Sequence, residues 1–99
     1  MEIKVNANGS NIEMAITGRI DTTTAPEFEK KVSAVIGNAN LLVLDFSTVE
    51  YISSAGLRVL LNAQKQMNAK GAKMVLKHVN ELVMEVFETT GFEDILTIE

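Results

Sequence analysis

The sequence predicts a single α/β domain over residues 1–99, with an N-terminal hairpin joined to a mixed, mostly parallel sheet that is packed with helices. Two observations support this prediction. Apolar and polar residues alternate in the first two segments, which is the pattern of paired strands. After them, helix-like and strand-like segments alternate and give the order β-β-α-β-α-β-α-β, which is typical of parallel strands joined by crossover helices. A chain of 99 residues has room for one hydrophobic core of modest size.

Two strands are expected at the start of the chain. Apolar residues occupy every second position from Ile3 to Ala7 and again from Ile12 to Ile16, as expected for strands with one buried face. Asn8-Gly9 lies between them and tolerates the positive φ of a tight turn, so we expect an antiparallel hairpin. The alternation ends at Gly18.

A first helix is predicted to begin at Thr24. Thr24 and Glu27 have the spacing of a capping box, in which each side chain satisfies a free amide of the first turn, and Pro26 is tolerated there. We expect Gly37 to end the helix in a left-handed conformation. The apolar stripe of this helix consists of Phe28, Val32, Val35 and Ile36.

The next strand and helix form the centre of the chain. Leu41–Leu44 is apolar on both faces, which is typical of a strand covered on both sides, and we expect Asp45 and Ser47 to close it. A second amphipathic helix follows Ser53-Ser54 and runs to about Ala69. Its inner stripe consists of Leu57, Leu60, Leu61, Gln64 and Met67.

A strand, a helix and a last extended segment complete the predicted fold. Met74–Leu76 is a short strand, Asn80 is expected to cap a third helix, and Gly91 to end it. The last extended segment lies around Ile95–Ile98. The inner face of the third helix is expected to consist of Leu82, Val83, Val86 and Phe87.

Composition excludes several classes of function. The chain has no cysteine, which excludes a thiol nucleophile, a zinc-thiolate site and an iron-sulfur cluster and fits a reducing cytoplasm. Its net charge of −4 has the wrong sign for binding a phosphate backbone, so nucleic acid is not an expected partner. No leader pattern is present and no apolar run approaches the length of a membrane span, so we expect neither secretion nor membrane insertion.

The residues that carry most enzyme chemistry are sparse. His78 is the only histidine and follows a short strand, so a catalytic triad or a two-histidine metal site would depend on it alone. We interpret it as a surface residue at a strand end. The glycines stand singly and do not form a phosphate loop with a lysine. We therefore predict no catalytic residue, no metal and no cofactor.

The segment Tyr51–Arg58 connects a predicted buried strand to an amphipathic helix, at the sheet edge where ligands and partners tend to dock. A structural interpretation is available, because serine is a preferred N-cap and the small pair Ala55-Gly56 lets a helix pack tightly on a sheet. Capping needs only one serine, however. The second hydroxyl would be open to a kinase, and a phosphate there would meet free amides at the positive end of the helix. Both interpretations are open on these grounds.

Three segments resemble the STAS domain, which anti-sigma factor antagonists share with the cytoplasmic tails of sulfate transporters. They are Gly18-Arg19-Ile20-Asp21 followed by Ala25, Leu42-Val43-Leu44-Asp45-Phe46-Ser47, and Ile52-Ser53-Ser54-Ala55-Gly56-Leu57-Arg58. The resemblance covers essentially the whole chain. It implies a STAS fold and a regulatory protein.

In the antagonists of this family, a serine at the start of the second helix is phosphorylated by a partner that is both an anti-sigma factor and a serine kinase. The common pattern is Asp-Ser-Ser-Gly-Leu, and this chain has Ala55 in the usual acceptor position. The related variant Ser-Ser-Ala-Gly-Leu implies that Ser54 is the phosphoacceptor, with Ser53 as second choice and no phosphorylation as a third possibility. The residues that the resemblance places in partner binding are Asp21, Thr22, Thr23, Ser53, Ala55, Gly56, Leu57 and Arg58.

The expected function is therefore a cytoplasmic, non-catalytic binding module that works by partner switching. Its unphosphorylated form would bind the anti-sigma factor/serine kinase, phosphorylation would release it, and a PP2C-type phosphatase would restore the active form. One alternative is an accessory STAS subunit of a membrane transport system, in which the serine is a cap. A weaker alternative is a nucleotide-binding domain that uses the helix entrance as an anion site, although the lysine loop is missing.

Overall fold

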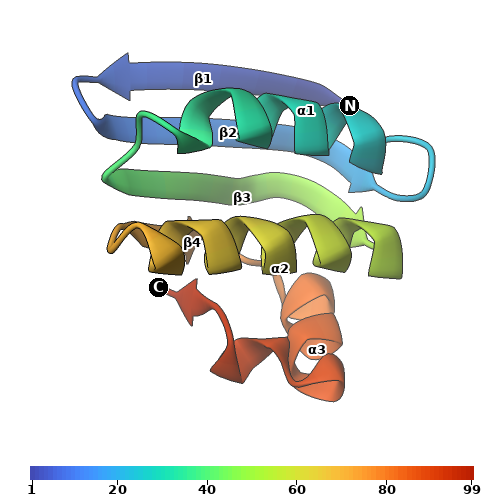
Figure 1. Cartoon of the computed structure of the whole chain (residues 1–99). Helices are drawn as coiled ribbons and strands as arrows, with labels where there is room; N and C mark the ends of the chain where they lie inside the picture. Colours follow the sequence, from blue (N-terminus) through green and yellow to red (C-terminus); the bar gives the residue numbers. More distant parts are fainter.

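The computed structural model describes all residues 1–99 and contains one five-stranded sheet and three α-helices (Figure 1). The strands lie in the order β1-β2-β3-β4-β5, antiparallel between β1 and β2 and parallel elsewhere. The predicted fold class and element order are confirmed, with one additional 3₁₀ turn, Phe92–Asp94, before the last strand. The elements are β1 (Glu2–Asn8), β2 (Asn11–Ile20), α1 (Ala25–Ile36), β3 (Leu41–Ile52), α2 (Ser54–Ala69), β4 (Lys73–Lys77), α3 (Glu81–Thr90) and β5 (Thr97–Ile98).

Strand β3 is longer than the sequence indicated. We expected Asp45 and Ser47 to close it, but it continues to Ile52 because β2 also continues, to Ile20, and offers a partner over the added length. The pairing resumes after a register shift with Thr17 opposite Thr48, whose hydroxyls are 2.9 Å apart. This extension brings the ends of β2 and β3 to the same edge of the sheet.

The helices cover one face of the sheet. Figure 1 shows α1 and α2 side by side in front of the strands. Helix α3 packs on the same face, since its Phe87 ring lies 6.5 Å, centroid to centroid, from Phe46 of β3. The expectation that β3 is covered on both sides is wrong, because Leu41 and Val43 point to the open face and are only half-buried.

Helix α2 approaches the sheet closely at Gly56. A Cβ atom at this position would lie 2.6 Å from Ile20 Cγ2 and 2.7 Å from Ile52 Cγ1. Such distances do not occur between real side chains, so a glycine is required for the start of α2 to rest directly on the ends of β2 and β3.

Helix α1 begins after Thr24 and ends before Gly37, as predicted, but the capping interactions at both ends differ from the prediction. Thr24 is the N-cap residue, but its side chain does not cap the helix, because Oγ1 accepts from Asp21 N at 2.9 Å and donates to Arg19 O at 2.7 Å within the preceding turn. Gly37 has a right-handed conformation, with φ −59°. The free carbonyls at this end accept instead from Lys70 Nζ, with distances of 2.7 Å to Ile36 O, 3.0 Å to Gly37 O and 2.8 Å to Ala39 O.

Helix α3 agrees with the prediction at both ends. The Asn80 side chain accepts from Val83 N at 2.8 Å, and Gly91 is left-handed with φ 79°. Leu82, which we expected on the inner face, is instead 52% exposed. No helix combines the length and the apolar character that crossing a membrane would require.

Candidate functional site

The candidate site is the start of α2, at the carboxyl edge of the sheet. Ser53 N donates to Ile20 O at 2.8 Å, which ties the strand-helix junction to the end of β2. Ser53 O then accepts from Leu57 N at 2.9 Å, the first hydrogen bond of the helix. Ser53 is therefore the N-cap residue and Ser54 the first residue of α2.

The two serine hydroxyls have different environments. Ser54 is exposed, whereas Ser53 Oγ is buried and has no hydrogen-bond partner. Although Ser53 occupies the N-cap position, no side chain caps α2. The amides of the first turn consequently remain free of side-chain acceptors, at the end of the helix where the dipole favours an anion.

A tight turn rich in hydroxyl groups precedes α1 and borders this site. Asp21 Oδ1 accepts from Thr23 N at 3.0 Å and from Thr24 N at 3.1 Å, so the carboxylate satisfies two amides of its own turn. These hydrogen bonds, that of Thr24 first, hold the pKa of Asp21 below its usual range, and the positive charge of Arg19 contributes. Asp21 is therefore a carboxylate at neutral pH, fixed by its own turn.

Arg19 connects this turn to the end of β3. Its guanidinium lies over the Tyr51 ring, 5.0 Å from the centroid, and its Nε is 3.9 Å from Asp21 Oδ2. Stacking on an aromatic ring and pairing with a carboxylate both orient a guanidinium. The Arg19 guanidinium and the Asp21 carboxylate therefore each have a fixed orientation at this edge of the sheet.

The structure divides the predicted partner-binding residues by exposure. Gly56 and Leu57 are buried, so they contribute to the packing of α2 against the sheet and not to an exposed surface. The residues that remain solvent-exposed are Thr22, Thr23, Ser54 and Arg58, while Asp21, Ser53 and Ala55 are half-buried. A shallow cleft of about 180 Å³ brings Thr22 together with Ala55 and Arg58, between the starts of α1 and α2. We call the four exposed residues with Asp21 and Ala55 the switch surface.

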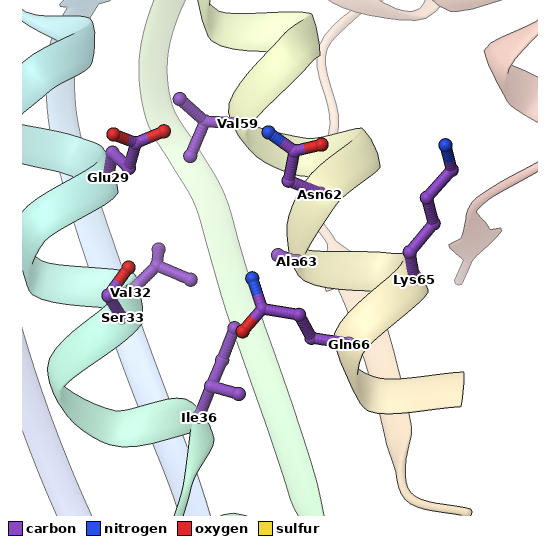
Figure 2. A pocket seen from close by; sticks show the side chains of 9 residues that line it. All are labelled: Glu29, Val32, Ser33, Ile36, Val59, Asn62, Ala63, Lys65 and Gln66. Carbon is purple, nitrogen blue, oxygen red and sulfur yellow. The ribbon is translucent and has the colours of Figure 1, made fainter. Parts of the chain in front are cut away.

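A groove that the sequence did not predict extends from this cleft. It lies between α1 and α2, has a volume of about 370 Å³, and shares Glu29 and Val59 with the cleft (Figure 2). Figure 2 shows Val32 and Ile36 on its α1 side and Asn62 and Gln66 on its α2 side, while Lys65 extends away from it. Apolar stripes identify which face of each helix is buried but not how far apart two helices lie, so no sequence signal could have revealed this groove.

His78 lies away from the switch surface. It is a surface residue at the end of β4, as predicted, with its side chain 65% exposed. Its Nδ1 is 3.0 Å from Asp45 Oδ1. The backbone amide of Ser47 lowers the pKa of Asp45, and the contact with His78 lowers it further. No three histidine or carboxylate side chains converge anywhere in the structure to hold a metal ion.

Residues 2–99 match the STAS domain. The chain belongs to this family. A STAS relative, an anti-sigma-B factor antagonist of Bacillus subtilis, is 28% identical over 98 residues, which cover 99% of this chain and 90% of that protein. BtrV, a candidate anti-sigma factor antagonist of Bordetella bronchiseptica, is 34% identical over 84 residues, covering 84% of this chain and 72% of BtrV.

Solved structures share the STAS fold. The anti-sigma factor antagonist SpoIIAA of Bacillus, in its unphosphorylated form, superposes with a TM-score of 0.84 at 15% identity, over 99% of this chain and 88% of SpoIIAA. Its phosphorylated form superposes with a TM-score of 0.77, over 99% of this chain and 91% of that chain. The STAS match includes the N-terminal hairpin and the last strand, so the family resemblance noted from the sequence is confirmed over the whole domain.

Proposed function

We propose that this STAS domain is an anti-sigma factor antagonist that works by partner switching in the cytoplasm. Its unphosphorylated form binds an anti-sigma factor that is also a serine kinase, phosphorylation of Ser54 releases it, and a PP2C-type phosphatase reverses the modification. The domain itself performs no catalysis. The names of its relatives in Bacillus and Bordetella support the antagonist role.

The observation that carries the proposal is the contrast between the two serines. A kinase must bring the γ-phosphorus of ATP into line with the attacking hydroxyl oxygen, which requires an accessible hydroxyl. Ser54 meets this requirement on the switch surface, while Ser53 Oγ is buried. The hydroxyl of Ser54 attacks, its proton passes to a base of the kinase, and ADP leaves.

The charge of one phosphate is sufficient to change binding. It adds about −1.5 to −2 charges to a chain whose net charge is −4. A hundredfold loss of affinity corresponds to about 2.7 kcal/mol. One pair of unit charges about 4 Å apart near a protein surface interacts by about 4 kcal/mol before screening. A carboxylate or carbonyl of the partner opposite Ser54 would therefore oppose docking of the phosphorylated form.

The same phosphate is compatible with the folded domain. It would sit at the first position of α2, beside amides without side-chain acceptors, where a negative charge stabilises a helix by about 0.3–1 kcal/mol. Arg58 is four residues further along the same helix and exposed, at the spacing at which opposite charges pair. Phosphorylation should thus change docking and leave folding intact.

The test is to incubate the chain with ATP and the candidate kinase and to locate phosphate by mass spectrometry. We expect phosphate on Ser54, and none on that peptide in Ser54→Ala. In calorimetric titrations with the kinase, Ser54→Ala should bind like the unmodified chain, and Ser54→Asp should bind more weakly with little change in melting temperature. Ser53→Ala is the matched control and should still be phosphorylated.

Three outcomes contradict the proposal. Equal affinity of unmodified, Ser54→Asp and phosphorylated chains would exclude the switch. Phosphate that appears without any kinase would indicate a nucleotide-hydrolysing domain. A stable complex with a transporter ATPase, without modification, would indicate an accessory transport subunit.

A further inference from the structure

Gln64 is a buried polar residue on the second half of α2, away from the switch surface. It is 6% exposed and is the only polar residue among the buried ones. Its Nε2 donates to Asn68 Oδ1 at 2.9 Å, whereas its Oε1 is buried and has no hydrogen-bond partner. Turning the amide over would place its NH₂ group in the same position, so one end lacks a partner in either orientation. Because buried polar groups are nearly always paired, a ligand that draws the Gln64 side chain toward the adjoining pocket would give this amide the partner it lacks.

Gln64 lines a pocket of about 310 Å³ between α2, β4 and β5. The pocket exists because β5 is short and pairs only with Val75 and Leu76. Lys73 and Met74, at the start of β4, therefore have no strand beside them on this edge of the sheet. Asn68 and Thr97 add an amide and a hydroxyl to the lining. The volume lies at the lower end of the range for small-molecule sites, which excludes a large ligand.

The charges around this pocket favour an anion. Lys73 lines it and forms no ion pair, whereas the other charged lining residue, Glu99, has its Oε1 3.9 Å from Lys77 Nζ. Among the side chains that line the pocket, the one unpaired charge is therefore positive. A hydroxyl group both donates and accepts, so it can satisfy the Gln64 amide in either orientation.

We propose that this pocket binds a small hydroxylated anion, with a carboxylate or phosphate facing Lys73 and a hydroxyl group facing Gln64. Hydroxy acids and polyol phosphates share this chemistry. The site is separate from the switch surface, so it adds a ligand-binding function that does not depend on the phosphorylation of Ser54.

The test follows the side-chain NH₂ signals of Gln64 and Asn68 by NMR while each of four probes is added to the intact chain. Glycerate and glycerol phosphate carry both charge and hydroxyls, propionate carries only the charge, and glycerol only the hydroxyls. We expect saturable shifts with glycerate or glycerol phosphate. Propionate and glycerol should bind at least about tenfold more weakly, which corresponds to about 1.4 kcal/mol. If glycerate binds more tightly than glycerol phosphate, the site prefers a carboxylate; the reverse order indicates a phosphate site.

Two variants test the assignment of residues. Lys73→Gln removes an exposed charge and should weaken binding of the anions at least about tenfold while the fold is unchanged. Gln64→Leu should abolish the difference between glycerate and propionate. No saturable shift with any probe, or equal binding by the unmodified chain and Lys73→Gln, would overturn the proposal, as would a long-lived water at Gln64 that no probe displaces.

Discussion

Ser53 and Ser54 are adjacent in the chain, and the structure assigns them different roles through one backbone geometry. Ser53 has an extended conformation, with φ −98° and ψ 176°, and contributes through its main chain to both β2 and α2. Its hydroxyl contributes no hydrogen bond. Ser54 is the first helical residue and is exposed. Only one of the two hydroxyls is therefore available to another protein.

Replacing Ser53 with alanine should leave stability nearly unchanged. The variant keeps both main-chain hydrogen bonds and removes a buried hydroxyl without a partner, so we expect the free energy of unfolding in urea to change by less than about 0.5 kcal/mol. Asn80→Ala is the matched control, because Asn80 does cap its helix and also donates to Val49 O at 2.8 Å. It should cost about 1–2 kcal/mol. Equal losses would mean that the Ser53 hydroxyl has a partner in solution.

The sequence was sufficient to locate the strand-helix junction, but it did not show which of the two serine hydroxyls is buried and which is exposed. Serine, alanine and glycine in this order indicate a helix start, and the family resemblance adds the switch. Which hydroxyl is buried depends on Ile20 and Ile52, against which α2 rests at Gly56. The contact with Ile20 joins residues that are distant in the chain, so no local pattern encodes it.

At the scale of the elements, Gly56 determines how closely α2 rests on the sheet. Gly56→Ala places a methyl group closer to two buried isoleucine side chains than van der Waals contact allows, and overpacking of this kind costs about 1–3 kcal/mol. Gly37→Ala is the control, because a Cβ there has nothing within 4 Å and the backbone is already right-handed. It should be neutral or stabilise by about 0.4–1 kcal/mol. Thermal and urea unfolding measure both variants, and a loss in Gly37→Ala similar to that in Gly56→Ala would contradict the packing argument.

Lys70 joins the end of α2 to the end of α1. Its ammonium group donates to three carbonyl oxygens, so Lys70→Met should lower the free energy of unfolding by about 1–3 kcal/mol. Lys65→Met is the control, since Lys65 is exposed and extends away from the groove in Figure 2. It should change stability by less than about 0.5 kcal/mol in urea unfolding. Equal effects would show that the carbonyl contacts contribute little in solution.

The end of α1 illustrates why local signals can fail. A glycine after an apolar stripe predicts a left-handed stop, and at Gly91 this is correct. At Gly37 the carbonyls are satisfied by Lys70, a residue 33 positions away, so no left-handed turn is needed. The residues around a helix end do not predict that a side chain distant in the chain will cap it.

At the scale of the whole molecule, the helices cover one face of the sheet and leave the other open. The alternation of strands and helices predicted the element order, but it did not predict which faces are covered. Leu41 and Val43 were expected to be covered, yet each has a polar partner on β2, Asn11 opposite Leu41 and Glu13 opposite Val43. On the β4 side, Lys73 lies opposite Leu41 and the apolar Val75 opposite Val43. The pairing of strands determines how apolar the open face is, and pairing is a property of the whole sheet.

Two carboxylates should make the folded domain sensitive to acid. The pKa values of Asp21 and Asp45 are both lowered, chiefly by the backbone amides of Thr24 and Ser47 respectively. A lowered pKa contributes stability that is present above the value of the unfolded chain, about 4, and is lost as pH falls through the lower value of the folded chain. We therefore expect the free energy of unfolding to fall below about pH 4.

The double variant Asp21→Asn/Asp45→Asn should lose part of this dependence, because its amides do not titrate, and its stability should differ less between about pH 7 and about pH 3 than that of the unmodified chain. Urea unfolding at the two pH values measures the difference. Asp94→Asn removes a carboxylate from the exposed turn before β5 and is the control for net charge. If it reduces the pH dependence as much as the double variant, the acid sensitivity comes from overall charge and not from the two hydrogen-bonded turns.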